Sequence, residues 1–150
     1  MKEYFKYDNG YVNINDENLF LTNSGNWSET KEINEKSSKT IRQNNLKGFK
    51  IYLFLFIIVC IFLLMISKSE GRGIPVGFLS LGLAAFFYMK RETGNKYKIP
   101  LSKITDIKIS GSEVKIVFLN ANNIEDLETI HKVESKGLHV LTELIQTFKK

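Results

Sequence analysis

The sequence predicts an α+β membrane protein, in which a transmembrane helical hairpin is inserted into a small antiparallel β-domain that ends in an amphipathic helix. Three observations predict this class. Two apolar stretches, residues 49–66 and 74–89, are separated only by residues 67–73. Short segments on both sides of this pair alternate apolar and polar residues, as half-buried strands do. The chain then ends in a segment whose apolar residues recur at helical spacing.

Three strands are predicted at the N-terminus. Residues 3–7 and 11–14 flank Asn9-Gly10, and Asn-Gly is the strongest short-range signal for a β-hairpin. Residues 18–22 predict a third strand by the same alternation. Apolar residues are sparse from residue 27 to 45, so we expect either a partly flexible connector or a short polar helix there.

The first apolar stretch, residues 49–66, predicts a membrane-spanning helix. It carries no charge after Lys50 and has no polar face, whereas a soluble core helix would show polar residues with a period near 3.6. A run of ~18–20 apolar residues rising 1.5 Å each matches the ~30 Å hydrocarbon core of a bilayer.

The second apolar stretch, residues 74–89, is shorter, and its length leaves open whether it crosses completely. About 16 residues make ~24 Å of helix, so crossing requires Lys90 and Arg91 to reach the headgroups or the bilayer to thin. Small side chains share one helical face and allow close approach of another helix: Gly77, Ser80 and Ala84. We expect this face to pack onto the first helix; a second molecule is the alternative.

Charges beside the two stretches predict the orientation. The flanks are rich in cations and contain one acidic residue, Glu92: Lys36, Lys39, Arg42, Lys47, Lys50, Lys90, Arg91, Lys96, Lys98 and Lys103. Because excess Lys and Arg mark the cytoplasmic side, we expect both termini in the cytoplasm and residues 67–73 outside. Six residues are predicted to contact lipid headgroups, anionic ones included, at the cytoplasmic interface: Lys47, Lys50, Tyr52, Tyr88, Lys90 and Arg91.

Strands followed by a helix are predicted in the C-terminal arm. The predicted strands are residues 97–101, 104–109 and 114–119, with turns at 110–113 and 120–123. Pro100 suggests that the first of these strands lies at a sheet edge. Residues 126–133 fit either a short helix or a final strand. The closing helix has Ser135 as a predicted cap, Lys149 and Lys150 at its C-terminal dipole, and an apolar stripe formed by Leu138, Leu141, Ile145 and Phe148.

The two polar arms, residues 1–48 and 90–150, are expected to form one cytoplasmic domain around the hairpin at residues 49–89. Each arm alone is close to the size at which a hydrophobic core becomes marginal, whereas together they match an ordinary domain. A hairpin returns the chain to the side that it left, so the arms can meet.

Residues 97–109, followed by 114–118, 128–134 and the closing helix, resemble the bacterial pleckstrin-homology-like (PH-like) membrane proteins, a group that includes YcxB-like proteins. The shared pattern covers about residues 97–148. It consists of a strand ending in an Ile-Pro step, a Lys-Ile turn, two hairpin strands and a C-terminal helix. The resemblance implies a small PH-like barrel capped by that helix, and a strand within residues 126–133. It transfers no ligand residues.

No sequence motif predicts catalysis, a cofactor or a metal site. The two histidines, His131 and His139, and the single cysteine, Cys60, have no ligand spacing. The net charge of +5 lies largely beside the apolar stretches, which argues against a nucleic-acid-binding face. The composition, rich in Asn, Lys and Ile, is typical of AT-rich bacterial genomes, so we expect the bacterial cytoplasmic membrane.

We therefore expect a non-enzymatic, membrane-anchored binding or adaptor module, or an accessory subunit of a membrane complex, that engages a protein partner or lipid. A partner strand is expected to dock at the sheet edge formed by Tyr97, Ile99 and Leu101. The alternative is a small self-assembling membrane regulator, such as an immunity protein or a defence effector, that oligomerises through the hairpin.

Overall fold

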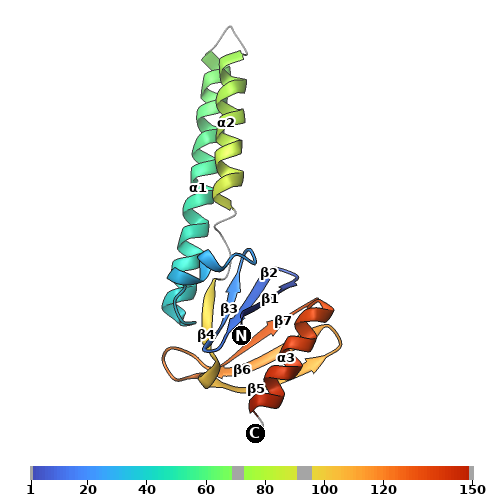
Figure 1. Ribbon diagram of the computed structural model, residues 1–150. Helices are drawn as coiled ribbons and strands as arrows, with labels where there is room; N and C mark the ends of the chain where they lie inside the picture. Colours follow the sequence, from blue (N-terminus) through green and yellow to red (C-terminus); the bar gives the residue numbers. More distant parts are fainter. Residues whose placement is uncertain (1, 69–72, 91–95, 149–150) are drawn as a thin grey trace. The chain divides into compact units, whose positions relative to one another are not determined.

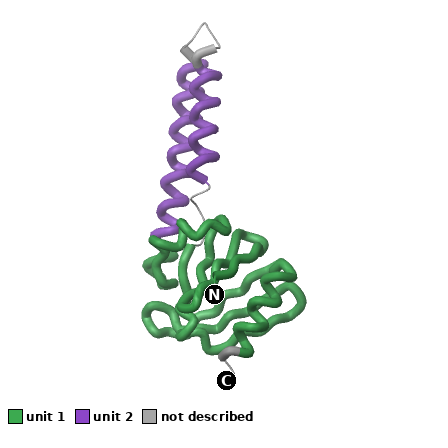
Figure 2. The backbone as a smooth tube through the Cα atoms, viewed as in Figure 1, with its two compact units in different colours: residues 1–41, 95–150 green, residues 42–94 purple. Residues whose placement is uncertain are grey.

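The computed structural model describes residues 2–68, 73–90 and 96–148, and the α+β class predicted from the sequence is confirmed. The chain divides into two compact units (Figure 2): unit 1 comprises residues 1–41 and 95–150, and unit 2 comprises residues 42–94. Unit 1 holds two antiparallel sheets and the C-terminal helix, and unit 2 is built from two long helices (Figure 1).

The first sheet, sheet A, has four strands in the order β1-β2-β3-β4. These strands are β1 (Lys2–Tyr7), β2 (Gly10–Asn15), β3 (Asn18–Thr22) and β4 (Tyr97–Pro100). The predicted turn joins β1 to β2, with Tyr7 opposite Gly10. Glycine is needed at position 10 because a Cβ there would overlap the carbonyl oxygen of Thr22 on β3.

Strands β3 and β4 are neighbours in sheet A, although the helices of unit 2 separate them in the sequence. They pair antiparallel, with Leu19 opposite Ile99 and Leu21 opposite Tyr97. The chain thus leaves the sheet at the end of β3 and re-enters it at the adjacent position. Residues 23–96 are therefore an insertion between two hydrogen-bonded strands.

The second sheet, sheet B, has three strands in the order β5-β6-β7. These are β5 (Ile104–Ser110), β6 (Glu113–Leu119) and β7 (Glu125–Ile130). Gly111 in the first turn has a φ of 60°, which glycine adopts without steric cost. The segment that was ambiguous in sequence is strand β7, which pairs with β6 through Ile116 and Glu128.

Helix α3 (Ser135–Phe148) is the predicted amphipathic helix. Its buried face is wider than the predicted stripe, because Val140 and Leu144 are buried beside Leu141. Ser135 is the first helical residue rather than the residue before the helix, while Lys149 and Lys150 lie outside the described residues.

Both sheets and α3 contribute to a single core. A Cβ at Gly137 would overlap the Phe5 ring, so glycine allows α3 to approach β1 closely. The buried core residues are Phe5, Tyr7, Val12, Ile14, Leu19, Leu21, Tyr97, Ile99, Leu101, Ile107, Val114, Ile116, Phe118, Ile130, Val133, Val140, Leu141 and Leu144.

The polar segment before the first apolar stretch is folded. It contains a short polar helix, η1 (Trp27–Glu32), which was one of the two expectations for this region. Residues 34–36 then run parallel to β4, with the Lys36 amide donating to the Lys98 carbonyl at 3.1 Å and the Lys98 amide to the Asn34 carbonyl at 3.0 Å. These residues are ordered by backbone hydrogen bonds, which hydropathy does not report.

Unit 2 contains α1 (Ser38–Lys68) from residue 42 onward and α2 (Gly73–Lys90), and the two helices lie side by side (Figure 1). Of the helices in the described part of the chain, only α1 is both long and apolar enough to cross a membrane. It begins at Ser38, about three turns before the predicted apolar stretch. Part of the predicted outer loop, residues 69–72, lies outside the described ranges.

Candidate functional site

An exposed apolar surface covers much of unit 2. Only 11% of the most apolar window of α1 is buried. The large apolar side chains exposed on the two helices include Phe49, Leu53, Phe56, Ile57, Leu63, Leu64, Ile66, Val76, Leu81 and Phe87. Soluble monomers rarely expose contiguous apolar patches beyond a few hundred Å², and larger ones mark membrane or protein contacts. This surface is therefore the first candidate for an interaction site.

The small-residue face of α2 does not make the contact with α1, which corrects our expectation for that face. No atom lies within 4 Å of a Cβ built on Gly77, and both Ser80 and Ala84 are exposed. Gly82 lies at the contact instead, where an added Cβ would come within 2.5 Å of Ile58. The reason is helical phase, because at 3.6 residues per turn Gly82 lies on nearly the opposite side of α2 from Ala84 and Gly77.

The described residues among those predicted at the lipid interface lie in the first half of α1 and in the last turn of α2. Lys47 and Lys50 are exposed on α1, and Lys90, also exposed, is the last residue of α2. Tyr52 and Tyr88 are exposed, and the Tyr52 ring packs against Phe86 with centroids 5.9 Å apart. Arg91 lies outside the described residues.

Unit 1 contains a buried charged centre around Lys36 that the sequence did not suggest. The Lys36 ammonium donates to Glu128 Oε2 at 2.9 Å, Asp126 Oδ1 at 3.2 Å and the Leu127 carbonyl at 3.3 Å. It also lies 5.2 Å from the ring centroids of both Tyr97 and Phe118. All three ammonium protons thus have acceptors, and two aromatic faces complete the cage.

Two tyrosines adjoin this centre. Burial, together with the negative charge of Glu128, raises the pKa of Tyr7 to about 12. Burial also raises the pKa of Tyr97 far above its usual range, and the nearby Glu128 carboxylate, which hydrogen-bonds its side chain, adds to the effect. Both hydroxyls therefore stay neutral at physiological pH.

The Lys36 centre holds the beginning of α1. Ser37 precedes α1, and its Oγ accepts from the Thr40 amide at 3.0 Å, as an N-cap side chain does. The Thr40 hydroxyl donates to the Glu35 carbonyl at 2.7 Å, and Glu35 pairs with Lys103 at 2.6 Å. The first turn of α1 is thus connected to strand β7 and to the β4–β5 junction.

The predicted docking edge is occupied by the chain itself. Tyr97, Ile99 and Leu101 are buried in the core of unit 1, so their side chains are not available to a partner. On the other edge of β4, residues 34–36 take the backbone positions that an added strand would use. The sequence could place Pro100 near an edge but could not show that a distant segment covers it.

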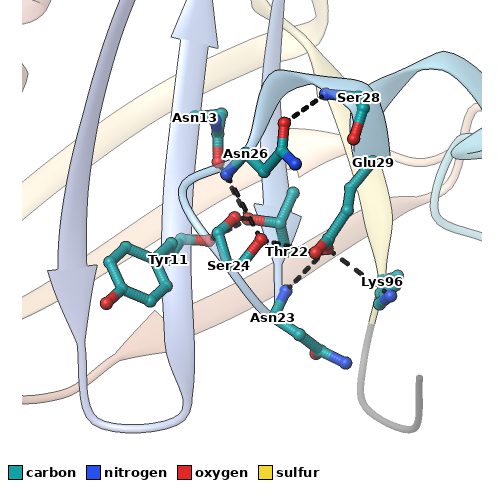
Figure 3. Close-up of polar contacts among 9 residues, drawn as sticks. All are labelled: Tyr11, Asn13, Thr22, Asn23, Ser24, Asn26, Ser28, Glu29 and Lys96. Atoms are coloured by element: carbon teal, nitrogen blue, oxygen red, sulfur yellow. Dashed lines mark hydrogen bonds and ion pairs between the residues drawn. The ribbon is translucent and has the colours of Figure 1, made fainter. Parts of the chain in front are cut away.

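A second polar network fixes the loop between β3 and η1 (Figure 3). Asn13 is fully buried and donates from Nδ2 to the Gly25 carbonyl at 3.1 Å, while the Thr22 hydroxyl lies 2.8 Å from Asn13 Oδ1. Glu29 on η1 accepts from Ser24 Oγ at 2.5 Å and pairs with Lys96 at 3.5 Å. This network joins the segments that precede α1 and follow α2.

One sequence signal could have revealed the Lys36 centre. Asp126, Glu128 and Ile130 alternate along β7, and Ile130 is buried, so both carboxylates point inward with it. Inward carboxylates require a cation. The sequence could therefore predict that a basic partner exists, but twenty-one Lys and Arg residues were candidates.

Within residues 2–68, 73–90 and 96–148, no three His, Cys, Asp or Glu side chains are grouped so that they could hold a metal ion. His131 pairs instead with Glu113 at 3.1 Å, and His139 with Glu143 at 3.5 Å. No family model, curated protein or solved structure matches this chain.

Proposed function

We propose that this chain is a non-enzymatic, membrane-anchored PH-like binding module, acting as an adaptor or an accessory subunit of a membrane complex. The observation that carries the proposal is the exposed apolar surface of α1, of which only 11% is buried in the most apolar window. An apolar surface of this extent is unfavourable in water. It is favourable in the hydrocarbon core of a bilayer, which a helix of this length can cross.

The pairing of β3 with β4 supports a hairpin that crosses the membrane twice. If α1 crossed alone, the strands that precede and follow the two helices would lie on opposite sides of the bilayer. The Leu19–Ile99 and Leu21–Tyr97 pairs could then not form. α2 has 18 residues, or about 27 Å of helix, close to the ~30 Å core. Lys90 at its end can extend to the headgroups.

The flanking charges support an arrangement with both termini in the cytoplasm of a bacterial cell. No acidic residue occurs from residue 36 to 69, while exposed cations precede the apolar part of α1. The positive-inside rule then assigns unit 1 to the cytoplasmic face.

The architecture of unit 1 supports a binding role. Four- and three-stranded antiparallel sheets share one core with a C-terminal helix. Over residues 97–148, strands followed by a closing helix are what the PH-like resemblance implies. The function of such a domain depends on the residues at its surface rather than on its fold.

Two experiments test the proposal. Reporters fused to either terminus should both report a cytoplasmic location, and an external location for one end would refute the hairpin. Affinity purification of the tagged chain from native membranes in mild detergent, followed by mass spectrometry, should then recover a stoichiometric partner.

A self-assembling membrane regulator is the second candidate, and the unoccupied small-residue face of α2 favours it. Overexpression of the wild type alongside the S80I/A84I variant distinguishes the two. Depolarisation of cells by the wild type alone would favour self-assembly through that face, and depolarisation by neither would favour the binding module.

A further inference from the structure

We propose that the exposed basic residues in the first half of α1, Arg42, Lys47 and Lys50, bind the phosphate groups of anionic phospholipids. This inference rests on the proposed membrane anchoring and names the lipid class that the anchor prefers. The site lies on a helix of unit 2 and not on the β-domain.

Within the described part of the chain, the three cations have no competing partner. All three are exposed, and among the described residues none makes an ion pair or a side-chain hydrogen bond with them. Other cations of the predicted basic flanks are already paired: Lys36 with Asp126 and Glu128, Lys96 with Glu29, and Lys103 with Glu35. The structure therefore separates the flanking cations into paired ones and ones that remain available to a ligand.

Two of the three cations, Arg42 and Lys50, belong to the outward face of α1. Arg42, Leu46, Phe49, Lys50 and Leu53 recur at spacings of three and four residues and therefore share one side of the helix. The apolar members of this set are exposed. The buried apolar residues of α1, Ile51 and Ile58, lie on a different side. Lys47, one turn before Ile51, lies on that second side, but its own side chain is exposed. The face that carries Arg42 and Lys50 is thus continuous with the apolar face proposed to meet lipid.

Their depth matches the phosphate layer. We place the boundary of the hydrocarbon core near Phe49. Lys47 then lies ~3 Å and Arg42 ~10 Å from this boundary on the headgroup side. The aliphatic part of the Lys50 side chain extends toward the headgroups. The interfacial region is roughly 5–8 Å thick on each side, and an Arg side chain spans the remaining distance. Arg also binds phosphate through two parallel hydrogen bonds.

The test uses the full chain reconstituted in bilayer nanodiscs of phosphatidylglycerol and phosphatidylcholine, with the bound lipids quantified by native mass spectrometry. The R42Q/K47Q/K50Q variant keeps helix propensity while removing three charges. The matched control, K108Q/K115Q/K132Q, removes three exposed charges from unit 1. At about 1 kcal/mol per cation, each removal should reduce phosphatidylglycerol enrichment about fivefold.

We expect the α1 variant to lose most of the enrichment and the control to retain it. Equal loss in both variants, or loss in neither, would overturn the inference. Release of the bound phosphatidylglycerol by millimolar inorganic phosphate would also overturn the inference, because the site would then bind soluble phosphate rather than lipid. Alkaline carbonate extraction separates the two proposals: release of the wild type from membranes refutes the anchoring itself, whereas a retained protein without enrichment refutes only the lipid site.

Discussion

Replacing Lys36 with Met removes the charge at the centre of unit 1 while keeping a side chain of similar length against the Tyr97 and Phe118 rings. The substitution deletes three hydrogen bonds and leaves the Asp126 and Glu128 carboxylates beside each other. Breaking a buried ion pair costs about 3–5 kcal/mol. Because the carboxylate side chains are 29% and 19% exposed, water partly solvates them, and we expect a loss of about 2–3 kcal/mol in the free energy of unfolding.

The assay follows the fluorescence of Trp27 during thermal unfolding of the full chain in detergent micelles. This is the only tryptophan in the sequence, and it packs edge-on against Phe20 with ring centroids 6.5 Å apart. Its signal therefore reports unit 1 without a contribution from the helices of unit 2. A loss of 1 kcal/mol lowers the midpoint of a domain of this size by about 4–8 °C.

Two further variants test whether the Lys36 centre stabilises unit 1 electrostatically. Lys103→Met breaks the more exposed pair with Glu35 and should cost about 1 kcal/mol or less. The K36M/D126N/E128Q triple variant should recover most of the loss, because it no longer leaves uncompensated charges at the centre. A loss for K36M no larger than that for K103M, or no recovery in the triple variant, would show that the Lys36 centre does not stabilise unit 1 electrostatically.

Three other predictions concern unit 1 and use the same fluorescence assay. The folded state holds the Tyr7 proton more tightly than the unfolded chain does, so its contribution is intact below pH 10 and is lost as the pH rises toward about 12. This loss amounts to about 2–3 kcal/mol, and Tyr7→Phe should reduce the alkaline sensitivity; an unchanged pH profile would contradict the assignment. Gly137→Ala places a Cβ against the Phe5 ring and should destabilise unit 1 by about 1–3 kcal/mol; an unchanged unfolding midpoint would refute the close approach of α3. Thr22→Val removes the hydroxyl beside the buried Asn13 and should cost about 1–3 kcal/mol, and a neutral result would mean that water replaces it.

Much of the secondary structure follows from local patterns. The alternation in residues 3–7, 11–14 and 18–22 corresponds to β1, β2 and β3, and Asn9-Gly10 forms the predicted turn. Each of these signals depends on neighbours a few residues apart, which is the range over which periodicity carries information.

The candidate sites could be predicted from the sequence only in part. Lys36 looked like one more flanking cation, and only the fold buries it beside Asp126 and Glu128, about ninety residues away in the chain. The edge of β4 looked free, because a segment ordered by backbone hydrogen bonds has no hydropathy pattern.

By itself, the sequence determined the α+β class, the positions of the two apolar helices and the amphipathic helix at the C-terminus, since composition and period are properties of contiguous residues. Only the tertiary structure decided which strands are neighbours across the helices, which cations are paired and which side of α2 meets α1. A periodic pattern specifies which residues share a face, but what that face contacts depends on long-range packing and hydrogen bonding between segments that no local pattern connects.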